Sequence, residues 1–485
     1  MTASYARLTT VPDVHPSLSS MPDATGPAMS ADDLVSLTGG RLLTRSGQRV
    51  RRAAVDSRLV EPGCLFVALP GERTDGHEHI DDAVARGAAA VLVTRPVPAP
   101  STDVTLIRVA DGLEALAAVA AGWRRRFHPI VVGVTGSIAK TSTKEAVAAV
   151  LARRFTTLRS EGNRNNEVGL PLTVLDLGPE HEALVLEMGM YVGGEIADLA
   201  RVARPSIGVV TAVQAVHLSR IGTLEAIEMA KGELLEALPA DGMAVLNADD
   251  PIVRRMGDRT AARSISYGFA DDADVGAEAV TSNGLAGMLF TLRTPTGRRS
   301  ARIPTLGRLS VHNALAAAAV GVAAGLTPDE VVAGLADGWS APHRVQLVRA
   351  AGVVLVDDTY NASPGSVTAA LQVLAELPGR RIAVLGEMLE LGEGHEDGHR
   401  IVGEVAAETV DRLVVVGEDA RAIADGAISA GLDPSRVVVV ADAESGLDHL
   451  LSRLRDGDVV LVKASRGIAL ESLVDALRTE LGPPT

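Results

Sequence analysis

VVGVTGSIAKTSTKE, residues 131–145, is the stretch of this sequence that decides its fold. With Ile130 before it, the apolar run Ile130–Val134 predicts a buried strand, and the pattern turns helical after a break at 136–139. A strand, a tight loop and a helix that opens on Lys140 are the layout of a phosphate cradle, because helix N-terminal amides and the helix dipole attract an anion.

The loop has the short form G-x-x-A-K-T, not the longer G-x-x-x-x-G-K-[ST]. Lys140 is expected to meet the outer phosphates of a nucleotide, and the hydroxyl of Thr141 a magnesium ion. A strand-to-helix turn with a solvated lysine is the alternative, and the neighbouring segments decide between the two. The expected cradle consists of Gly136, Ser137, Ala139, Lys140, Thr141 and Ser142.

The overall composition limits the classes of function that this protein can have. The 485 residues predict about three domains, and a hydrophobic fraction of 47% with 2% aromatics predicts aliphatic cores. The formal net charge of −15 argues against nucleic acid or an acidic membrane surface as the main partner. A local basic pocket can still hold an anionic substrate.

Cysteine usage and hydropathy favour a cytoplasmic protein. The single cysteine, Cys64, cannot form an internal disulfide and lies in an apolar run, so it is expected in a core. The longest apolar run, Ala314–Leu326, is too short to cross a bilayer, so no membrane insertion is expected. Residues 1–28 lack periodicity and the order of a signal peptide, which predicts a disordered extension.

Residues 29–126 are expected to form a small α/β unit. Polar clusters follow its strands, and such strand ends hold ligands in α/β folds. In Asp56-Ser57-Arg58, turn chemistry would explain the aspartate but not the pair Ser57 and Arg58. The expected strands are Ala53–Asp56, Cys64–Leu69, Ala89–Val93 and Val104–Val109, and the expected helices start at Ser30 and span His77–Arg86 and Gly112–Arg125.

Residues 127–338 add polar positions to the phosphate loop. Asn165 and Asn166 lie in a loop dense in donors and acceptors. Glu187 follows the apolar strand Ala183–Leu186, and a carboxylate at the C-terminal end of a parallel strand suits magnesium. A plain exposed glutamate at a strand end is the alternative.

The helix expected at Thr223–Leu238 carries Lys231 on its apolar stripe. Such a lysine usually snorkels to water. If it is buried instead, its pKa falls, and the neutral amine can take up carbon dioxide to become a carbamate, an oxygen ligand for a metal. His217 follows the expected strand Ile207–Val213, and a lone histidine there is more often structural than a ligand.

Residues 339–485 alternate strands and helices, which predicts a doubly wound sheet. Polar clusters follow its strands at 357–361, 386–387 and 463–466, and three such clusters in one domain indicate a binding crest. The expected strands are Val353–Val356, Ile382–Leu385, Leu413–Val416, Val437–Val440 and Val459–Val462.

With these residues in view, the chain resembles the Mur ligase family over about residues 30–485. Motifs in the family's order and spacing carry the resemblance: DSRLVEPGCLFVALPGERTDGH, TGSIAKTSTKE, NRNNEVGLPLTVL, LEMG, AKGELLEALP, LNADDP, VDDTYNASPGSV, VLGEMLELG and VKASRG. The resemblance implies an α/β fold of three domains. They are a UDP-substrate-binding domain at 29–126, a central P-loop-type parallel-sheet ATPase domain at 127–338 and a C-terminal Rossmann-like domain at 339–485.

The chain most resembles family members that add D-alanyl-D-alanine to UDP-N-acetylmuramoyl-tripeptide. This implies a cytoplasmic bacterial ligase of peptidoglycan synthesis, a process that serves cell shape and division; we expect a monomer. ATP would phosphorylate the free carboxylate of the tripeptide, and the dipeptide amine would attack the acyl phosphate and release phosphate. A free carboxylate is a poor electrophile, and the anions brought together need magnesium and cations to screen them.

The resemblance also implies roles for individual residues. Lys140, His217 and Lys231 match the catalytic positions, with Lys140 as the phosphate lysine. Thr141 and Glu187 match a first magnesium site, and His217 with a carbamylated Lys231 a second, so two Mg²⁺ ions are implied. The remaining matches are Asn313 for adenine, Arg344 and Asp358 for ATP on domain closure, Ser57 and Arg58 for uridine, Asn165 and Asn166 for substrate binding, and Tyr360 and Asn361 for the incoming peptide.

The sequence departs from the family pattern in the phosphate loop, where Ile138-Ala139 replaces the usual Asn-Gly. If residue 139 has a positive φ, alanine there costs about 1–2 kcal/mol. Met190-Tyr191-Val192-Gly193 and Leu309-Ser310 are further departures. They leave open a related ligase that joins a different acid and amine. A non-catalytic nucleotide-binding relative is the third hypothesis, and the retained phosphate and metal residues argue against it.

Overall fold

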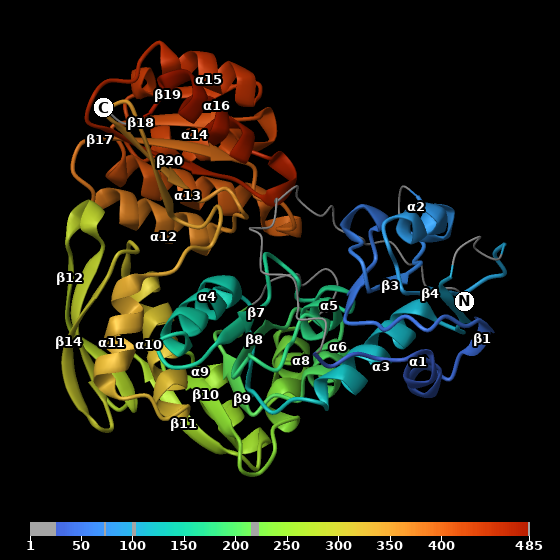
Figure 1. Ribbon diagram of the computed structural model, residues 1–485. Helices are drawn as coiled ribbons and strands as arrows, with labels where there is room; N and C mark the ends of the chain where they lie inside the picture. The colour runs from blue at the N-terminus through green and yellow to red at the C-terminus, as the bar shows by residue number, and fades with distance from the viewer. Residues whose placement is uncertain (1–25, 72–73, 99–102, 215–222, 484–485) are drawn as a thin grey trace.

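Three β-sheets organise the chain in the computed structural model, which describes residues 26–71, 74–98, 103–214 and 223–483. Each sheet has its own helices, and the three units follow one another along the chain. Figure 1 shows the blue first unit and the red third unit on different sides of the green and yellow central unit.

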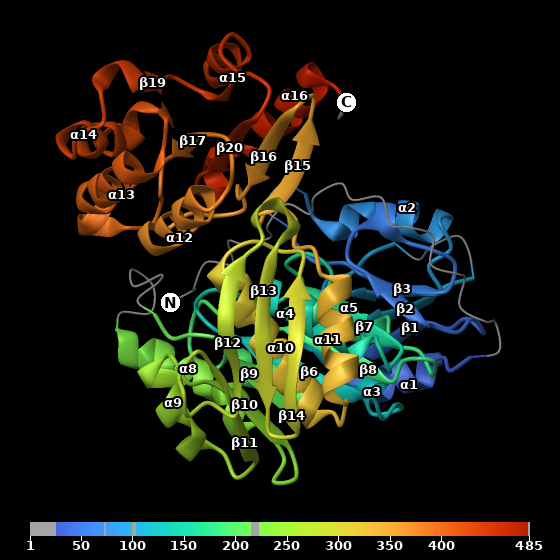
Figure 2. The ribbon, with the colours of Figure 1, turned by 90° about the vertical axis from the view of Figure 1, so that its left-hand side faces the viewer.

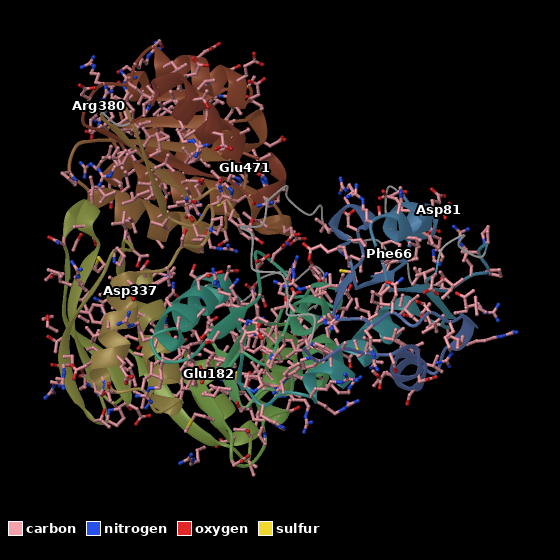
Figure 3. All side chains as sticks on the ribbon, in the orientation of Figure 1. Phe66, Asp81, Glu182, Asp337, Arg380 and Glu471 are labelled. Atoms are coloured by element: carbon pink, nitrogen blue, oxygen red, sulfur yellow. The ribbon has the colours of Figure 1, made fainter. Side chains whose placement is uncertain are left out.

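The first unit is a five-stranded sheet in the order β1-β5-β4-β3-β2, parallel except for β1. Phe66 lies inside it, fully buried (Figure 3), and Cys64 is buried as predicted. Its elements are α1 (Ala31–Thr38), β1 (Arg41–Thr44), β2 (Arg52–Ala54), β3 (Cys64–Val67), α2 (Ile80–Ala85), β4 (Ala90–Val93), β5 (Thr105–Arg108) and α3 (Gly112–Arg124).

Helix α3 fixes the first unit to the central one. The indole of Trp123 donates to the carbonyl of Leu177 at 2.9 Å, and the guanidinium of Arg124 donates to the carbonyl of Ala203 at 2.9 Å. Buried apolar side chains of both units form one continuous core around these contacts. The two units therefore share a packed interface.

The central unit is a nine-stranded sheet in the order β14-β13-β12-β11-β10-β9-β6-β8-β7. The strands from β7 to β12 pair in parallel, whereas β12, β13 and β14 pair antiparallel. The strands are β6 (Ile130–Thr135), β7 (Thr157–Arg159), β8 (Ala183–Glu187), β9 (Ile207–Val210), β10 (Met243–Asn247), β11 (Arg263–Gly268), β12 (Val275–Ser282), β13 (Met288–Thr294) and β14 (Gly297–Ile303). The helices are α4 (Lys140–Leu151), α5 (Gly169–Leu175), α6 (Glu195–Ala203), α8 (Leu224–Glu236), α9 (Pro251–Arg255), α10 (Arg308–Ala323) and α11 (Pro328–Asp337).

The third unit is a six-stranded sheet in the order β15-β16-β20-β17-β18-β19, parallel except for β15. Figure 2 shows the antiparallel ribbon of β12 to β14 reaching up to this unit, and Leu285 at its tip packs against the third core. The elements are β15 (Gln346–Ala350), β16 (Val353–Asp357), α12 (Pro364–Ala375), β17 (Arg380–Gly386), α13 (His395–Thr409), β18 (Arg412–Val416), α14 (Arg421–Ser429), β19 (Val437–Val440), α15 (Ala443–Leu451), β20 (Asp458–Lys463) and α16 (Glu471–Leu481).

Several expected elements differ from the structure at their ends; the strands expected at Cys64–Leu69 and Ile207–Val213, for example, stop at Val67 and Val210. The helix expected at His77–Arg86 begins as a 3₁₀ turn, Gly76–His79, because the Asp75 carboxylate accepts from the His77 amide and tightens the chain. The strand expected at Ala53–Asp56 stops two residues early, since Asp56 caps the next 3₁₀ turn. The edge strands β1 and β15 and the ribbon of β12 to β14 were not anticipated.

Candidate functional site

The phosphate loop lies between β6 and α4, where the sequence predicted it. Gly136 has a φ of 149°, and a Cβ there would lie 1.9 Å from Oγ1 of Thr211, so only glycine fits. The Thr211 hydroxyl donates to the carbonyl of Ile138 at 2.6 Å, and the Ser137 amide donates to the carbonyl of Ala212 at 2.8 Å. The residues after β9 therefore fix the conformation of the phosphate loop.

Ala139 caps helix α4 in the left-handed conformation, with φ 64° and ψ 3°. The condition set out from the sequence is met, so the methyl group strains the loop by about 1–2 kcal/mol. No side chain caps the helix at this end, which leaves the amides of the first turn to bind an anion. Ser142 lies half-buried in the same turn.

Lys140 is half-buried and folds back over the loop, where its Nζ donates to the carbonyl of Gly136 at 2.8 Å. Burial lowers the pKa of this amine, the carboxylate of Glu187 opposes the shift, and the charge of Arg344 adds to it. The metal-binding candidate and the arginine of the third unit are therefore both within electrostatic reach of Lys140.

Glu187 is the last residue of β8 and is buried, with 2% of its surface exposed. The hydroxyl of Thr141 donates to Oε2 at 2.7 Å, and the amide of Asn165 donates to Oε1 at 2.8 Å. The plain exposed glutamate considered as the alternative is excluded. Because Thr141 and Glu187 meet directly after the loop, they present a hydroxyl and a carboxylate where a nucleotide-bound Mg²⁺ would lie.

Lys231 lies on α8 and is buried, with 3% of its surface exposed, so the snorkelling alternative is wrong. Its pKa is lowered well below the ordinary value, mainly by burial and also by the charge of Lys140. The two amines are thus near each other in the same part of the central unit. A buried amine with a lowered pKa has the neutral form that reacts with carbon dioxide.

Asn313 lies on α10 and is almost fully buried, with Oδ1 accepting from the hydroxyl of Thr143 at 3.2 Å. This bond joins α10 to α4, and Figures 1 and 2 show the two helices side by side. The neighbouring His312 was missed: its Nε2 lies 3.1 Å from Oδ1 of Asn247 and 3.3 Å from Oδ2 of Asp249. The LNADD motif, quoted only for the resemblance, was the available signal.

Ser57 and Arg58 of the first unit differ in burial and in their hydrogen-bond partners. Ser57 is buried and donates to Asp82, and this hydrogen bond is the main cause that lowers the pKa of that carboxylate. Arg58 is exposed and its guanidinium pairs with Asp56 at 2.7 Å. Both residues therefore have local structural partners, the arginine at the surface and the serine in the interior.

The four predicted residues of the third unit lie near the C-terminal ends of β16 and β20. Asp358 is buried, and its carboxylate accepts from Nζ of Lys463 at 2.6 Å. Lys463 also donates to the carbonyl of Asn361 at 2.7 Å. The guanidinium of Arg344 stacks on Tyr360, with 3.6 Å between its Cζ and the ring centroid. Lys463 lies in one of the polar clusters expected at the strand ends, but the sequence did not predict this ion pair.

Two predicted residues remain, His217 and Asn166. His217 lies outside the described residues. Asn166 lies next to Asn165, but its Oδ1 accepts from the Gly169 amide at 2.9 Å and so helps to begin α5. In the free protein its side chain is already used by the fold.

Metal binding at Glu187 would need ligands from outside the protein. Within the described ranges, no group of three or more His, Cys, Asp or Glu side chains could hold a metal ion. A Mg²⁺ ion usually keeps waters and takes phosphate oxygens in addition to one or two protein ligands, which fits the pair Thr141 and Glu187.

None of the helices described here is long and apolar enough to span a bilayer.

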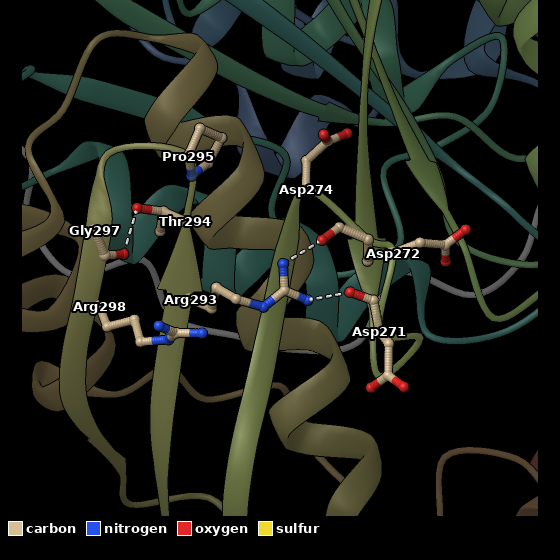
Figure 4. A pocket seen from close by; sticks show the side chains of 9 residues that line it. Asp271, Asp272, Asp274, Arg293, Thr294, Pro295, Gly297 and Arg298 are labelled. Carbon is tan, nitrogen blue, oxygen red and sulfur yellow. Dashed lines mark hydrogen bonds between the residues drawn. The ribbon is translucent and has the colours of Figure 1, made fainter.

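A shallow pocket of about 480 Å³ lies away from this site, on the antiparallel side of the central sheet (Figure 4). Arg293 fills its centre and donates to the carbonyls of Ala273 at 2.6 Å and Asp271 at 3.2 Å. The arginine fastens the turn before β12 to β13. We assign this pocket a structural role.

Family comparisons cover most of the chain. Residues 50–124 match the family described as Mur ligase family, catalytic domain, residues 134–321 match the Mur ligase middle domain, and residues 343–466 match the Mur ligase, glutamate ligase domain. All three matches point to one family.

Individual relatives agree with these matches. The chain is 40% identical over 431 residues to the UDP-N-acetylmuramoyl-tripeptide–D-alanyl-D-alanine ligase of Escherichia coli, covering 87% of this chain and 92% of the relative. A crystal structure of MurF from Acinetobacter baumannii has a TM-score of 0.84 at 30% identity and covers 94% of this chain and 99% of that one. The MurF ligase of Thermotoga maritima in complex with ADP has a TM-score of 0.78 at 30% identity, covering 89% of this chain and 98% of that one.

Proposed function

The chain belongs to the Mur ligase family, and from this premise we propose that it joins D-alanyl-D-alanine to UDP-N-acetylmuramoyl-tripeptide with ATP, in peptidoglycan precursor synthesis. It is an ATP-dependent ligase that forms an amide bond. One observation supports the reaction most strongly. A buried carboxylate, Glu187, held by Thr141 and Asn165, adjoins an uncapped helix N-terminus and two amines of lowered pKa.

ATP binding would use the loop from Gly136 to Ser142. Gly136 lets the loop pack closely against Thr211, the amides of the first turn of α4 would donate to the phosphates, and Lys140 would exchange its bond to Gly136 for an outer phosphate. Asn313 would contact the adenine. Arg344 and Asp358 would reach ATP from the third unit, and the electrostatic effect of Arg344 on Lys140 supports this part of the proposal.

Two Mg²⁺ ions would screen the charge that the reaction concentrates. The first would be held by Thr141 and Glu187, and the second by His217 and a carbamylated Lys231. Burial of Lys231 supports its carbamylation, because the neutral amine is the reactive form. When bound, the ions neutralise phosphate and carboxylate oxygens and polarise the transferring phosphoryl group.

The substrates would be distributed over the three domains, which we place at 29–126, 127–338 and 339–485. Ser57 and Arg58 would hold the uridine part in the first domain, and Asn165 and Asn166 would contribute to substrate binding in the central domain. Tyr360 and Asn361 would receive the dipeptide. The tripeptide carboxylate becomes an acyl phosphate, the dipeptide amine attacks it, and phosphate leaves. We further propose that the protein acts as a cytoplasmic monomer.

Phosphate release tests the proposed function. Purified protein is incubated with ATP and Mg²⁺ and with UDP-tripeptide, dipeptide, both or neither, alongside a panel of other amines and UDP-peptides. Sustained release is expected only when UDP-tripeptide and D-alanyl-D-alanine are both present. Equal release with and without the substrates would overturn the ligase assignment, and a stronger response to another pair would reassign the substrates.

A further inference from the structure

We propose that Arg466, held against Tyr360 in the third unit, binds the terminal carboxylate of the incoming dipeptide. This inference rests on the proposed function, because it names the group that anchors one of its two substrates. The sequence pointed to Tyr360 and Asn361 for this substrate and left Arg466 unassigned.

Two guanidinium groups meet at a single aromatic ring. The Cζ atom of Arg344 lies 3.6 Å from the ring centroid of Tyr360, and the Cζ atom of Arg466 lies 5.1 Å from it. A guanidinium held by a ring keeps its N–H donors for another partner and loses less side-chain freedom when it binds one. The ring of Tyr360 therefore preorganises two anion-binding groups.

The charge of these arginines is not neutralised within the part of the chain that the structure describes, because no ion pair to either guanidinium is present there. The carboxylate of Asp358 is close enough for Arg344 to lower its pKa, but Lys463 already binds it at 2.6 Å. Arg466 is exposed. Two adjacent cations without a carboxylate of their own attract an anionic ligand.

The position of the cluster fits a substrate site. Tyr360 follows β16 and Arg466 follows β20, and these strands pair in parallel, so both residues lie at the C-terminal edge of the sheet where α/β folds bind ligands. Arg344 is within electrostatic reach of Lys140. Arg344, one member of the cluster, is therefore near the phosphate loop of the central unit.

The length of the dipeptide sets where its carboxylate must bind. Its amine has to meet the activated carboxyl group beside the phosphate loop, and an extended dipeptide reaches only about 7 Å further. A receptor for the other end must therefore lie in the third unit, next to the loop. A guanidinium binds a carboxylate through two parallel N–H···O bonds, so Arg466 suits this end while Arg344 remains for the phosphate.

Steady-state kinetics with two dipeptide probes test the inference. Wild type, Arg466→Ala and Arg466→Lys are compared on D-alanyl-D-alanine and on its C-terminal amide, D-alanyl-D-alaninamide, at saturating ATP and UDP-tripeptide. Arg478→Ala is the matched control, since this exposed arginine lies on α16 and its guanidinium pairs only with Asp475 among described residues. Melting curves verify that each variant is folded.

The wild type should prefer the acid to the amide about 10–100-fold in kcat/KM, the range expected for a charge-assisted bond to a carboxylate. Arg466→Ala should raise the KM for the acid by a similar factor, lose most of this preference and keep its KM for ATP within about twofold. Arg466→Lys should keep an intermediate preference for the acid, because lysine retains the positive charge but lacks the two parallel N–H donors of the guanidinium. The control should match the wild type.

Three results would overturn the inference. The first is an Arg466→Ala variant that still prefers the acid to the amide as strongly as the wild type does. The second is a wild type that turns over the acid and the amide equally well. The third is a change in Arg466→Ala that is confined to the KM for ATP, which would mean that Arg466 binds the nucleotide. Wild type that releases no phosphate with either probe would overturn the proposed function itself. That outcome is distinct, because in the other three the ligase turns over.

Discussion

Ala139 shows how one methyl group can set the state of a site. It holds the left-handed conformation at the start of α4, where the donors for a phosphate gather. Residues with a Cβ resist this conformation, and a bound nucleotide would favour it by satisfying the free amides. Strain at this residue is therefore a reason to expect coupling between nucleotide binding and loop order.

Replacing Ala139 by glycine should relieve the strain. Because glycine also gains freedom in the unfolded chain, the expected net effect is a stabilisation of only about 0.5–1 kcal/mol, with a lower KM for ATP. Ala149→Gly in the middle of α4 is the control and should destabilise the protein by about 1 kcal/mol. Denaturant unfolding measures both. Destabilisation by both variants to the same extent would mean that residue 139 is not left-handed.

Lys231 should make stability depend on pH. Its folded-state pKa lies below the ordinary value of 10.5, so between those two values the unfolded chain binds more protons and stability rises with pH. Lys231→Met removes this term. In carbon dioxide-free buffer, the variant should exceed the wild type in stability most at low and neutral pH, with the difference shrinking toward pH 10.5. A pH-independent difference would contradict the lowered pKa. The variant should also lose ligase activity.

At the scale of elements, the loop before α5 is joined to β8 by the bond from Asn165 to Glu187. A hydrogen bond to a buried carboxylate contributes about 1.5–3 kcal/mol, and its loss leaves an acceptor without a donor. Asn165→Ala should therefore lower the melting temperature and raise the Mg²⁺ concentration needed for phosphate release. Asn163→Ala, exposed in the same loop, should change neither. Equal effects from both variants would show that the bond has no special role.

Strongly periodic elements could be predicted from the sequence, and weakly periodic ones could not. The apolar run Ile130–Val134 and the helix that contains Lys231 have clear periodic patterns, and the structure places both as expected. Strand β12 alternates only partly, because its first two residues are both buried and its exposed positions come in adjacent pairs, Glu278 with Ala279 and Thr281 with Ser282. Edge strands such as β15 bury few side chains and give little signal.

Candidate site residues could be predicted from the sequence where they stand next to a strand or helix that the sequence pattern already indicates. Glu187 and Lys140 stand at the ends of elements that the pattern already defines. The ion pair of Asp358 with Lys463 joins residues 105 positions apart, and only the parallel pairing of β16 with β20 brings them together. Such contacts depend on strand order, which a single sequence does not reveal.

At the scale of the whole molecule, an ion cluster crosses the interface between the first two units. Asp176, after α5, lies 3.9 Å from Nε of Arg52 in β2 and 3.6 Å from Nη1 of Arg164. Burial raises the pKa of this carboxyl to about 6, and the two arginines only partly oppose the shift. Arg164 precedes Asn165, so the cluster adjoins the loop that holds Glu187.

The ion cluster at Asp176 should lower the stability of the folded protein as pH rises. Between 3.8 and about 6 the folded state binds more protons at Asp176 than the unfolded state, so wild-type stability falls across that window. Asp176→Asn lacks this dependence. Its melting temperature relative to the wild type should therefore increase from pH 4 to pH 7 and level off above about 6. A relative melting temperature that falls with pH would mean that the two arginines outweigh burial.

Oxygen tracing tests the central claim, that the site activates a carboxylate by transferring a phosphoryl group to it. UDP-tripeptide labelled with ¹⁸O in the acceptor carboxyl group is turned over with ATP, Mg²⁺ and D-alanyl-D-alanine, and the released phosphate is examined by mass spectrometry. Each released phosphate should carry one ¹⁸O atom, because the carboxyl oxygen that bonds to phosphorus leaves with it. Phosphate without label, formed together with product, would contradict the account.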